Sequence, residues 1–385
     1  MQPVIKLKKI SILFLLLLGF LSGKAQLDNS FLYTPETDSM VSKNARFGFI
    51  IDNMNYVRNT EYHTVIEAGA TWAGTQIWPQ GVFRFTPNLT FKGGAFLQKD
   101  FGNNKFRTLI PTYTVSYTKK NLKVNFGTLD GGLDHNLIEP LYAIENNIDR
   151  RIENGLQFKG QKNRLKFDVW VDWRTMIYRT SNFQEQFTVG ISSKYFLVNK
   201  PDFSWSVPLQ ITGHHKGGEI YTYPHDNIST RFNIAIGTQI TKNMQGAALD
   251  KVEFSAYQLF YEDLSPTKSD SFIDGNGTYV NLLLQKNHFG VMLNYLETFQ
   301  FMSPMGEPLY LSNNRSGNGD YLQYRKMAML RLLYNLELAK NCYLVARMTN
   351  VYDFSENEYN NAIEIYLKIN IGNKPGNLIS LYQPK

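Results

Sequence analysis

Two things are scarce in this sequence of 385 residues. Cys342 is its only cysteine, so no internal disulfide can form and the fold cannot be a disulfide scaffold. After the first 25 residues, no apolar run approaches the roughly 18 residues that a membrane-spanning helix requires. The sequence therefore predicts no helical membrane protein.

The excess of positive charge is also smaller than it first looks. Residues 1–25 have a basic front, an apolar core from Ile10 to Leu21, and small residues at Gly23 and Ala25. This is the pattern of a cleavable secretory signal. It holds four lysines and no acid, so the remaining chain has 36 basic and 33 acidic residues, a net charge of about +3. Such a balance gives no indication of nucleic-acid binding.

What the chain does have is alternation. In RLKFDVWVDW, from Arg164 to Trp173, apolar side chains occupy every second position and charged ones fall between them. Successive side chains of a strand point to opposite faces, so this stretch predicts a two-faced strand, whereas a helix would scatter the charges through its apolar side. The same period recurs from Phe203 to Thr212 and from Ala362 to Ile371.

About sixteen such segments follow one another, and the pattern is compatible with about 14–18. Each segment is close to the ~10 residues that a tilted membrane-spanning strand needs. No convincing amphipathic helix interrupts them. Their expected starts are Ala45, His63, Leu89, Phe106, Leu122, Ile152, Arg164, Glu185, Phe203, Ile228, Val252, Thr278, Phe289, Tyr321, Tyr343 and Ala362.

Short and long connections alternate along the series. Many short ones carry a Lys-Asn pair, as at Lys120-Asn121, Lys162-Asn163 and Lys340-Asn341, and asparagine tolerates the left-handed conformation of tight turns. Each pair alone indicates only an ordinary hairpin. The alternation predicts that all short turns lie at one end of the sheet and all long loops at the other.

With this pattern the chain resembles the porin-like outer-membrane β-barrels of Gram-negative bacteria. The resemblance implies an all-β fold: a single closed antiparallel transmembrane barrel with short periplasmic turns and long extracellular loops. We expect a signal peptide at 1–25, a periplasmic lead-in at 26–44, the barrel at 45–372 and a C-terminal tail at 373–385. A soluble β-sandwich would also alternate, but it does not explain the asymmetry of the connections.

The resemblance further implies transport, and a barrel of this size leaves a water-filled interior. We therefore expect a channel for small hydrophilic solutes in the cell outer membrane. The expected partners are outer-membrane lipid, the solutes, other envelope proteins and further copies of the chain, without nucleic acid and without a cofactor. Candidate lumen-facing residues are Lys92, Lys123, Arg164, Lys166, Asp168, Asp172, Glu253, Arg331, Glu337, Arg347, Glu364 and Lys368. The alternative is a non-conducting barrel, plugged by inward Phe96 and Trp170, that serves as scaffold or assembly partner in a surface complex for secretion, glycan uptake or envelope attachment.

The longest connection, from Gly131 to Gly155, is rich in charge. By the same resemblance it is the candidate constriction of the channel, and an outer lid over the barrel mouth is the alternative. Its candidate residues are Asp134, His135, Glu139, Glu145, Asp149, Arg150 and Arg151.

An enzyme is the remaining possibility, since a few outer-membrane barrels are lipid hydrolases that use Ser and His on the outer wall. No Ser/His/acid set has a spacing that identifies a triad, because triads are recognised by geometry. His214 and His215 begin a loop that also holds His225 and Asp226, but neighbours in a strand face opposite sides and cannot readily share one metal ion. We expect no catalytic residue, no metal site and no enzyme activity.

Overall fold

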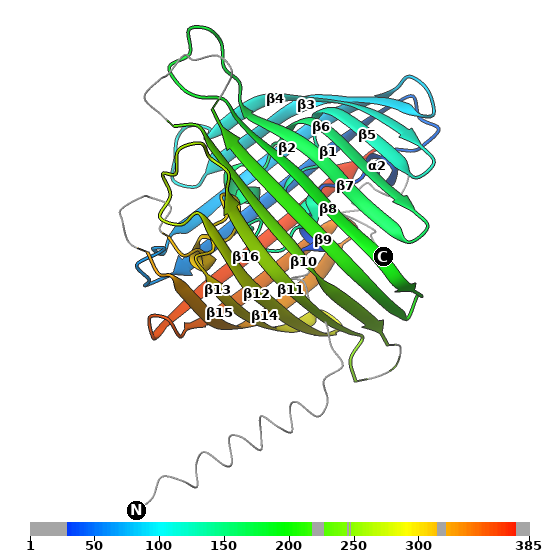
Figure 1. The fold of residues 1–385 in the computed structure, drawn as a ribbon. Helices are drawn as coiled ribbons and strands as arrows, with labels where there is room; N and C mark the ends of the chain where they lie inside the picture. Colours follow the sequence, from blue (N-terminus) through cyan, green and yellow to red (C-terminus); the bar gives the residue numbers. More distant parts are fainter. Residues whose placement is uncertain (1–28, 218–226, 245, 247, 314–320, 375–385) are drawn as a thin grey trace, which may run out of the picture.

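The structure, a computed structural model, describes residues 29–217, 227–244, 246, 248–313 and 321–374. Sixteen strands form one closed antiparallel barrel (Figure 1). The first eight are β1 (Phe47–Glu61), β2 (Thr71–Arg84), β3 (Leu89–Asp100), β4 (Thr108–Lys119), β5 (Leu122–Thr128), β6 (Asn154–Lys162), β7 (Leu165–Thr175) and β8 (Gln186–Asn199). The others are β9 (Phe203–Lys216), β10 (Ser229–Asn243), β11 (Lys251–Asp263), β12 (Asp274–Lys286), β13 (Phe289–Phe299), β14 (Tyr324–Ala339), β15 (Cys342–Asp353) and β16 (Glu358–Gly372).

The barrel closes where β1 pairs with β16, from Ile50 opposite Gly372 to Glu61 opposite Asn361. Closure leaves no unpaired sheet edge, as a lipid environment requires, because lipid offers no water to satisfy backbone groups. The predicted fold class, strand number and closure are therefore confirmed. The predicted signal peptide, and the tail from residue 375, lie outside the described residues.

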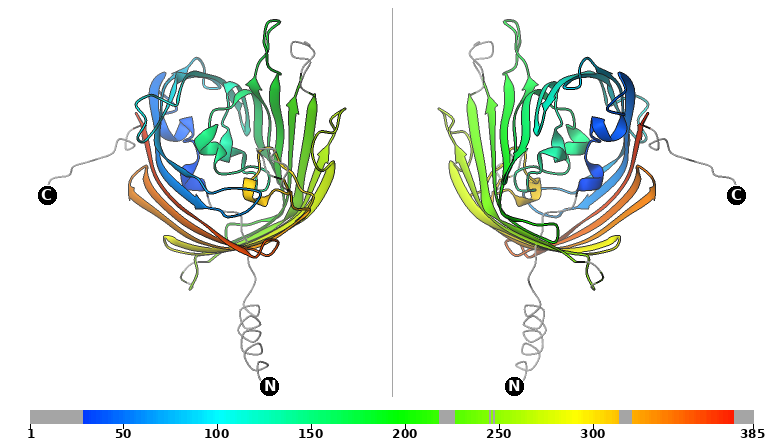
Figure 2. Two further views of the ribbon diagram at one scale, coloured as in Figure 1. Left: turned by 90° about the vertical axis from the view of Figure 1, so that its left-hand side faces the viewer. Right: turned by 90° about the vertical axis from the view of Figure 1, so that its right-hand side faces the viewer.

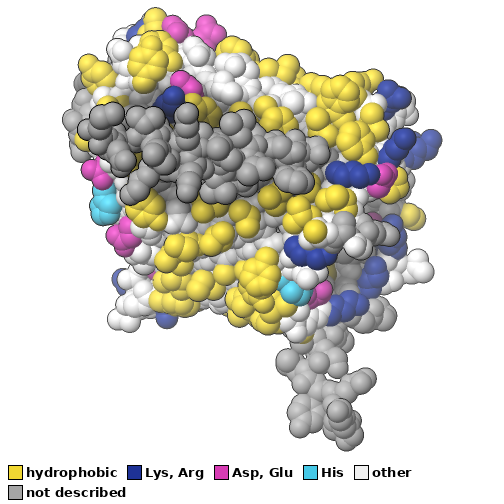
Figure 3. Space-filling model, turned by 90° about the horizontal axis from the view of Figure 1, so that it is seen from below, with side chains coloured by type: hydrophobic (Ala, Val, Ile, Leu, Met, Phe, Trp, Pro, Cys, Tyr) yellow, Lys and Arg dark blue, Asp and Glu magenta, His cyan; other side chains and the backbone are white. Residues whose placement is uncertain are grey.

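The alternation in the sequence becomes an inner and an outer face. On β7, Trp170 is 5% exposed and its neighbour Val169 is 36% exposed. Exposed apolar side chains cover the outer wall, among them Leu109, Phe126, Val169, Trp173, Ile236 and Ile365. In Figure 3 hydrophobic side chains spread over the visible wall, and Lys and Arg gather at its right-hand end. The outer wall thus matches the hydrocarbon interior of a bilayer.

The connections also follow the predicted rhythm. The shortest turns are residues 120–121, 163–164, 287–288 and 340–341, and the longest connections are 129–153 and 300–323. Positive φ angles of 52° at Asn163 and 63° at Asn341 explain why asparagine recurs in the short turns.

One predicted strand start was far from the observed one, and the others lie within four residues of the observed starts. The second strand begins at Thr71 and not near His63. His63 instead forms an isolated bridge with Ala68, and the backbone N–H of Thr60 donates to the carbonyl oxygen of Ala70. Residues 62–70 therefore form a tight connection, which the alternation pattern alone could not distinguish from a strand.

The inside of the barrel is filled by chain, not only by side chains of its wall. Figure 2 looks into the barrel and shows short helical turns within the ring of strands. They are η1 (Ser30–Leu32), α2 (Thr37–Met40), η2 (Gly132–His135), α3 (Asn146–Asp149) and η3 (Pro308–Tyr310). Among the described residues no helix is long and apolar enough to cross a membrane.

A single apolar cluster joins these inner segments to the wall. Ile138, Leu141 and Ile148 of the 129–153 loop are at most 1% exposed, and they share this cluster with Leu309 and with Leu32. Complete burial of each such side chain stabilises by roughly 1.5–3 kcal/mol. The two longest connections and the N-terminal segment therefore pack together inside the barrel.

Candidate active site

One densely charged contact inside the barrel surrounds His135. Its Nδ1 lies 2.9 Å from Asp168 Oδ2 and its Nε2 lies 2.8 Å from Glu153 Oε2. The imidazole ring stacks on Trp170 with 3.5 Å between centroids, and the residue is 1% exposed. Asp168 and Trp170 both point inward because they are two positions apart on β7.

Both ring nitrogens of His135 face carboxylate oxygens, so the doubly protonated ring satisfies both contacts. Burial by itself would lower the pKa of His135, but the carboxylates of Glu153 and Asp168 outweigh burial and raise that pKa to about 9. Burial by itself would raise the pKa of Glu153, but His135, Arg174 and the backbone N–H of Gly132 together outweigh burial and lower that pKa. His135 is therefore a fixed cation with no free nitrogen, which makes it a structural anchor and not a base.

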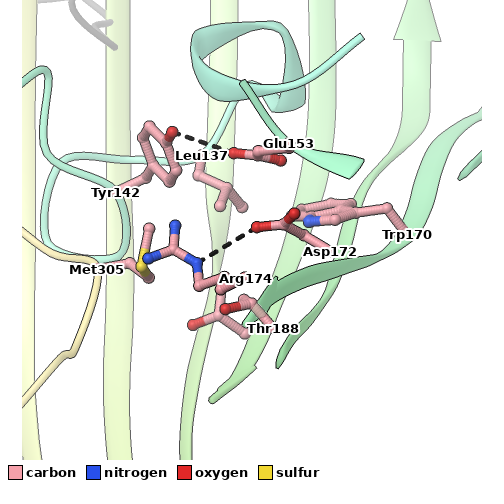
Figure 4. Close-up of a pocket in the computed structure, with 9 residues that line it drawn as sticks. Leu137, Tyr142, Glu153, Trp170, Asp172, Arg174, Thr188 and Met305 are labelled. Carbon is pink, nitrogen blue, oxygen red and sulfur yellow. Dashed lines mark hydrogen bonds and ion pairs between the residues drawn. The ribbon is translucent and has the colours of Figure 1, made fainter. Parts of the chain in front are cut away.

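Beside this contact lies a small cavity of about 10 Å³, lined in part by Tyr142, Glu153, Asp172, Arg174 and Thr188 (Figure 4). The Tyr142 hydroxyl donates to Glu153 Oε1 over 3.1 Å, and Arg174 Nε lies 3.3 Å from Asp172 Oδ2. A volume of this size holds about one water molecule. The cavity has no room for an organic substrate.

The other charged residues of the loop are tied to different parts of the barrel. Glu139 pairs with Arg331 of β14, Glu145 with Arg58 of β1, Arg151 with Asp52 of β1, and Asp149 with Arg107. Asp134 accepts a hydrogen bond from the backbone N–H of Thr34 over 3.1 Å, and Arg150 is exposed. The loop is thus fixed on several sides, with much of its charge neutralised by the barrel wall.

The residues expected to face the lumen divide into two groups. One group is buried: Lys92, Asp168, Asp172, Glu253, Arg331, Arg347, Glu364 and Lys368. The other lies half-buried or exposed near the short turns: Lys123, Arg164, Lys166 and Glu337. Several of the buried residues pair inside the barrel, as Lys368 does with Asp52.

A different arrangement occurs at the long-loop end of β9, where two histidines are adjacent. His214 faces inward, with its Nδ1 3.2 Å from the hydroxyl oxygen of Thr188 on β8. His215 faces outward, with its Nδ1 2.8 Å from the hydroxyl oxygen of Thr230 on β10. The His215 ring also lies 4.9 Å from the ring of Phe187.

The two histidines cannot serve one metal ion, as strand geometry predicts. His225 and Asp226, which the sequence places in the following loop, lie outside the described residues. Within the part of the chain that the structure describes, no group of three or more His, Cys, Asp and Glu side chains is arranged to hold a metal ion.

The outer wall next to Thr230 contains a groove of about 330 Å³. Phe232 lies two residues after Thr230 on the same face of β10, so the groove adjoins the His215–Thr230 pair. Its lining residues come from β10, β11 and β12: Phe232, Ile234, Gln258, Phe260, Tyr261, Glu262, Asp274, Gly275 and Asn276.

The His215–Thr230 contact has the chemistry of acyl transfer. A neutral imidazole that accepts a hydroxyl proton turns a weak nucleophile into an effective one. Both residues are only half-buried, so the pair is accessible from the lipid side. Sequence reasoning missed it because the partners, Phe187, His215 and Thr230, lie on three neighbouring strands and form no contiguous motif. The available signal was a histidine on the apolar face of a strand.

Comparison with known proteins adds a family. The family described as "Lipid A 3'-O-deacylase-type" matches residues 38–374, and none of the curated proteins matches the chain. Among solved structures, the loop L8 deletion mutant of OmpT from Vibrio cholerae has a TM-score of 0.50 at 9% identity, covering 85% of this chain and 100% of that one. OprD from Pseudomonas aeruginosa has a TM-score of 0.48 at 10% identity, covering 85% and 96%. At such identities the OmpT likeness shows the barrel fold alone.

The family match overturns two expectations. The expected porin function, with residues 131–151 as its constriction, is wrong, and so is its non-catalytic scaffold alternative, because the matched family is one of lipid A deacylases. The expectation that the chain is not an enzyme is wrong for the same reason. The charged loop does pack inside the barrel, in an apolar cluster, but a position inside the barrel does not by itself indicate a channel. The prediction of an outer-membrane β-barrel is not affected by this correction.

Proposed function

The chain belongs to the lipid A 3'-O-deacylase-type family, and from this premise we propose that it hydrolyses an acyl ester of lipid A at its outer wall. One observation carries the assignment of the site: the 2.8 Å contact between His215 and Thr230 lies on the face that meets lipid. A substrate held in the bilayer by its acyl chains reaches the barrel from that side. The pair also lies near the long-loop end, which corresponds to the outer leaflet.

The chemistry follows from the two side chains. Thr230 Oγ1 attacks the ester carbonyl carbon while His215 Nδ1 takes the hydroxyl proton. The C–O bond to the sugar breaks, and His215 returns the proton to the departing sugar oxygen. Water, deprotonated by the same imidazole, then attacks the acyl-threonine ester. The products are a free fatty acid and a sugar hydroxyl, and Thr230 is regenerated with its proton.

Among the described residues, the inner face offers no comparable site for a lipid. His135 has both nitrogens engaged, and the neighbouring cavity holds about one water. The inner pair His214–Thr188 is separated from the bilayer by the wall of the barrel. A lipid ester would have to cross a packed interior to reach it.

The test is lipid A hydrolysis by the purified full chain in vesicles, followed by mass spectrometry of the lipid. We expect loss of one ester-linked acyl chain from wild type and about a 10³-fold slower loss from His215→Asn. His214→Asn is the matched control, since it removes the adjacent imidazole from the opposite face, and it should retain the wild-type rate. No acyl loss from wild type would refute the function, and loss of activity only in His214→Asn would refute the site.

The same proposal includes the route to the membrane. Residues 1–25 have the composition of an export signal, and mature chain beginning at Gln26 would support its removal. The proposed division then follows as a lead-in at 26–44, a barrel at 45–372 and a tail at 373–385. N-terminal sequencing of the protein from outer membranes tests the first boundary.

A further inference from the structure

The groove beside Thr230 has two chemically different ends. Glu262 and Asp274 are directly opposite one another on β11 and β12, close to the long connections. Two residues deeper on the same face, Phe260 of β11 lies opposite Asn276 of β12. On its other side, Phe260 lies opposite Ile234 of β10. Carboxylates that accept hydrogen bonds thus line the outer end, and the deeper part combines the apolar Phe260 and Ile234 with the uncharged polar Asn276 and Gln258.

An acylated sugar in the outer leaflet has the same polarity. Its hydroxyl and amide groups lie at the membrane interface and donate hydrogen bonds, and its acyl chains descend into hydrocarbon. A chain that enters beside Thr230 passes Phe232 and then Ile234, because all three share one face of β10. The path therefore starts at the reacting hydroxyl.

The deeper end of the groove is marked by a polar contact on the lipid-facing wall. Thr278 donates a hydrogen bond from its hydroxyl to Gln258 Oε1 over 3.4 Å, and Gln258 is opposite Ile236 of β10. From Thr230 to Ile236 the strand spans about 20 Å. Methylene groups placed against an amide and a hydroxyl lose the apolar contact that stabilises them higher in the groove.

We propose that this groove binds the fatty acyl chain whose ester is cleaved, and that the Gln258–Thr278 contact limits the length of the chain it accepts. The inference rests on the proposed function, which it extends from lipid A in general to an acyl chain of limited length. Phe232, Ile234 and Phe260 provide the apolar contact. Glu262 and Asp274 hold the sugar end through its hydroxyl and amide hydrogens.

The test measures chain-length selectivity with a short-chain and a long-chain acyl ester. Ile234→Trp fills the groove and should lower kcat/KM for the long ester about tenfold relative to the short one, the effect of roughly two methylenes. Gln258→Leu combined with Thr278→Val removes the polar contact and should shift the preference towards the long ester. Val291→Trp is the matched control, since Val291 is an outward residue of β13 and is 38% exposed.

A second readout separates this inference from the proposed function. Spin-labelled fatty acid in vesicles should show an immobilised component with wild type and with Val291→Trp, and less of it with Ile234→Trp. Hydrolysis with unchanged length preference and unchanged immobilisation would overturn the groove while leaving the function intact. Immobilisation that responds to Ile234→Trp in a chain without hydrolytic activity would refute the function and support the groove as a lipid site.

Discussion

His135 and His215 differ in how many polar partners surround their imidazole rings. His135 lies inside the barrel between two carboxylates and on an indole ring. His215 lies on the outer wall, half-buried, with one hydroxyl at 2.8 Å. The inner histidine is surrounded by far more charge, yet every polar atom of its ring is engaged. Density of charge therefore marks an anchor here, and the sparser arrangement is the one that we propose reacts.

The largest expected effect comes from removing the outer hydroxyl. Thr230→Val keeps the shape of the side chain but deletes the proposed nucleophile, so we expect lipid A deacylation to fall about 10³-fold. Thr188→Val makes the same change beside the inner His214 and should leave the rate unchanged. Thr230→Ser restores a hydroxyl and should restore most of the rate, and failure of this rescue would indicate that the hydroxyl only shapes the wall.

The inner anchor should respond in stability and not in rate. His135→Asn leaves Glu153 and Asp168 buried without their shared cation, which costs about 3–5 kcal/mol. We expect an earlier urea unfolding midpoint in detergent and an unchanged deacylation rate per folded molecule. A large loss of rate in correctly folded His135→Asn would show that the inner contact takes part in the reaction.

The pH dependence of stability provides a third comparison. Since the pKa of His135 is raised to about 9, its contribution is fully present below about pH 6.5 and is lost as pH rises through about 9. Its size is about 3 kcal/mol. The lowered pKa of Glu153 adds a contribution that is lost as pH falls below the ordinary glutamate range. Urea unfolding across this range should show the alkaline loss in wild type and not in His135→Asn.

The smallest effect is expected at the exposed edge of the same loop. Asp149 and Arg107 pair with each other, and their side chains are 43% and 34% exposed. Such exposed ion pairs contribute at most about 1 kcal/mol to the free energy of unfolding. Asp149→Asn should therefore shift the unfolding midpoint slightly, and less than His135→Asn does. An equal shift in both variants would show that burial does not set the strength of these anchors.

The fold could be predicted from sequence because each spanning strand has a lipid-facing and an inner face. Apolar and polar residues therefore alternate along each strand. In β7, from Leu165 to Thr175, the alternation alone indicates which side chains share a face. The predicted strand start near His63 was wrong for a local reason, because apolar and polar residues can also alternate in the connection between two strands. Turn residues such as Asn163 and Asn341 fixed which connections are short.

The site could not be predicted in the same way, because its members meet only when β8, β9 and β10 pair in one particular register. His215 gains Phe187 and Thr230 from neighbouring strands, and the sequence separation between them carries no motif. The charged stretch from Gly131 to Gly155 attracted attention because its charges are local. Its actual partners, such as Arg331 and Arg58, are distant in sequence, so its anchoring role was hidden.

The most direct measurement is the position of the acyl group in protein quenched with acid during turnover. Peptide mass spectrometry should find the acyl chain on Thr230 in wild type and in His214→Asn, and should find none there in His215→Asn. An acyl group on an inner residue such as Thr188, or full turnover without any acylated Thr230, would contradict the account of an outward-facing nucleophile.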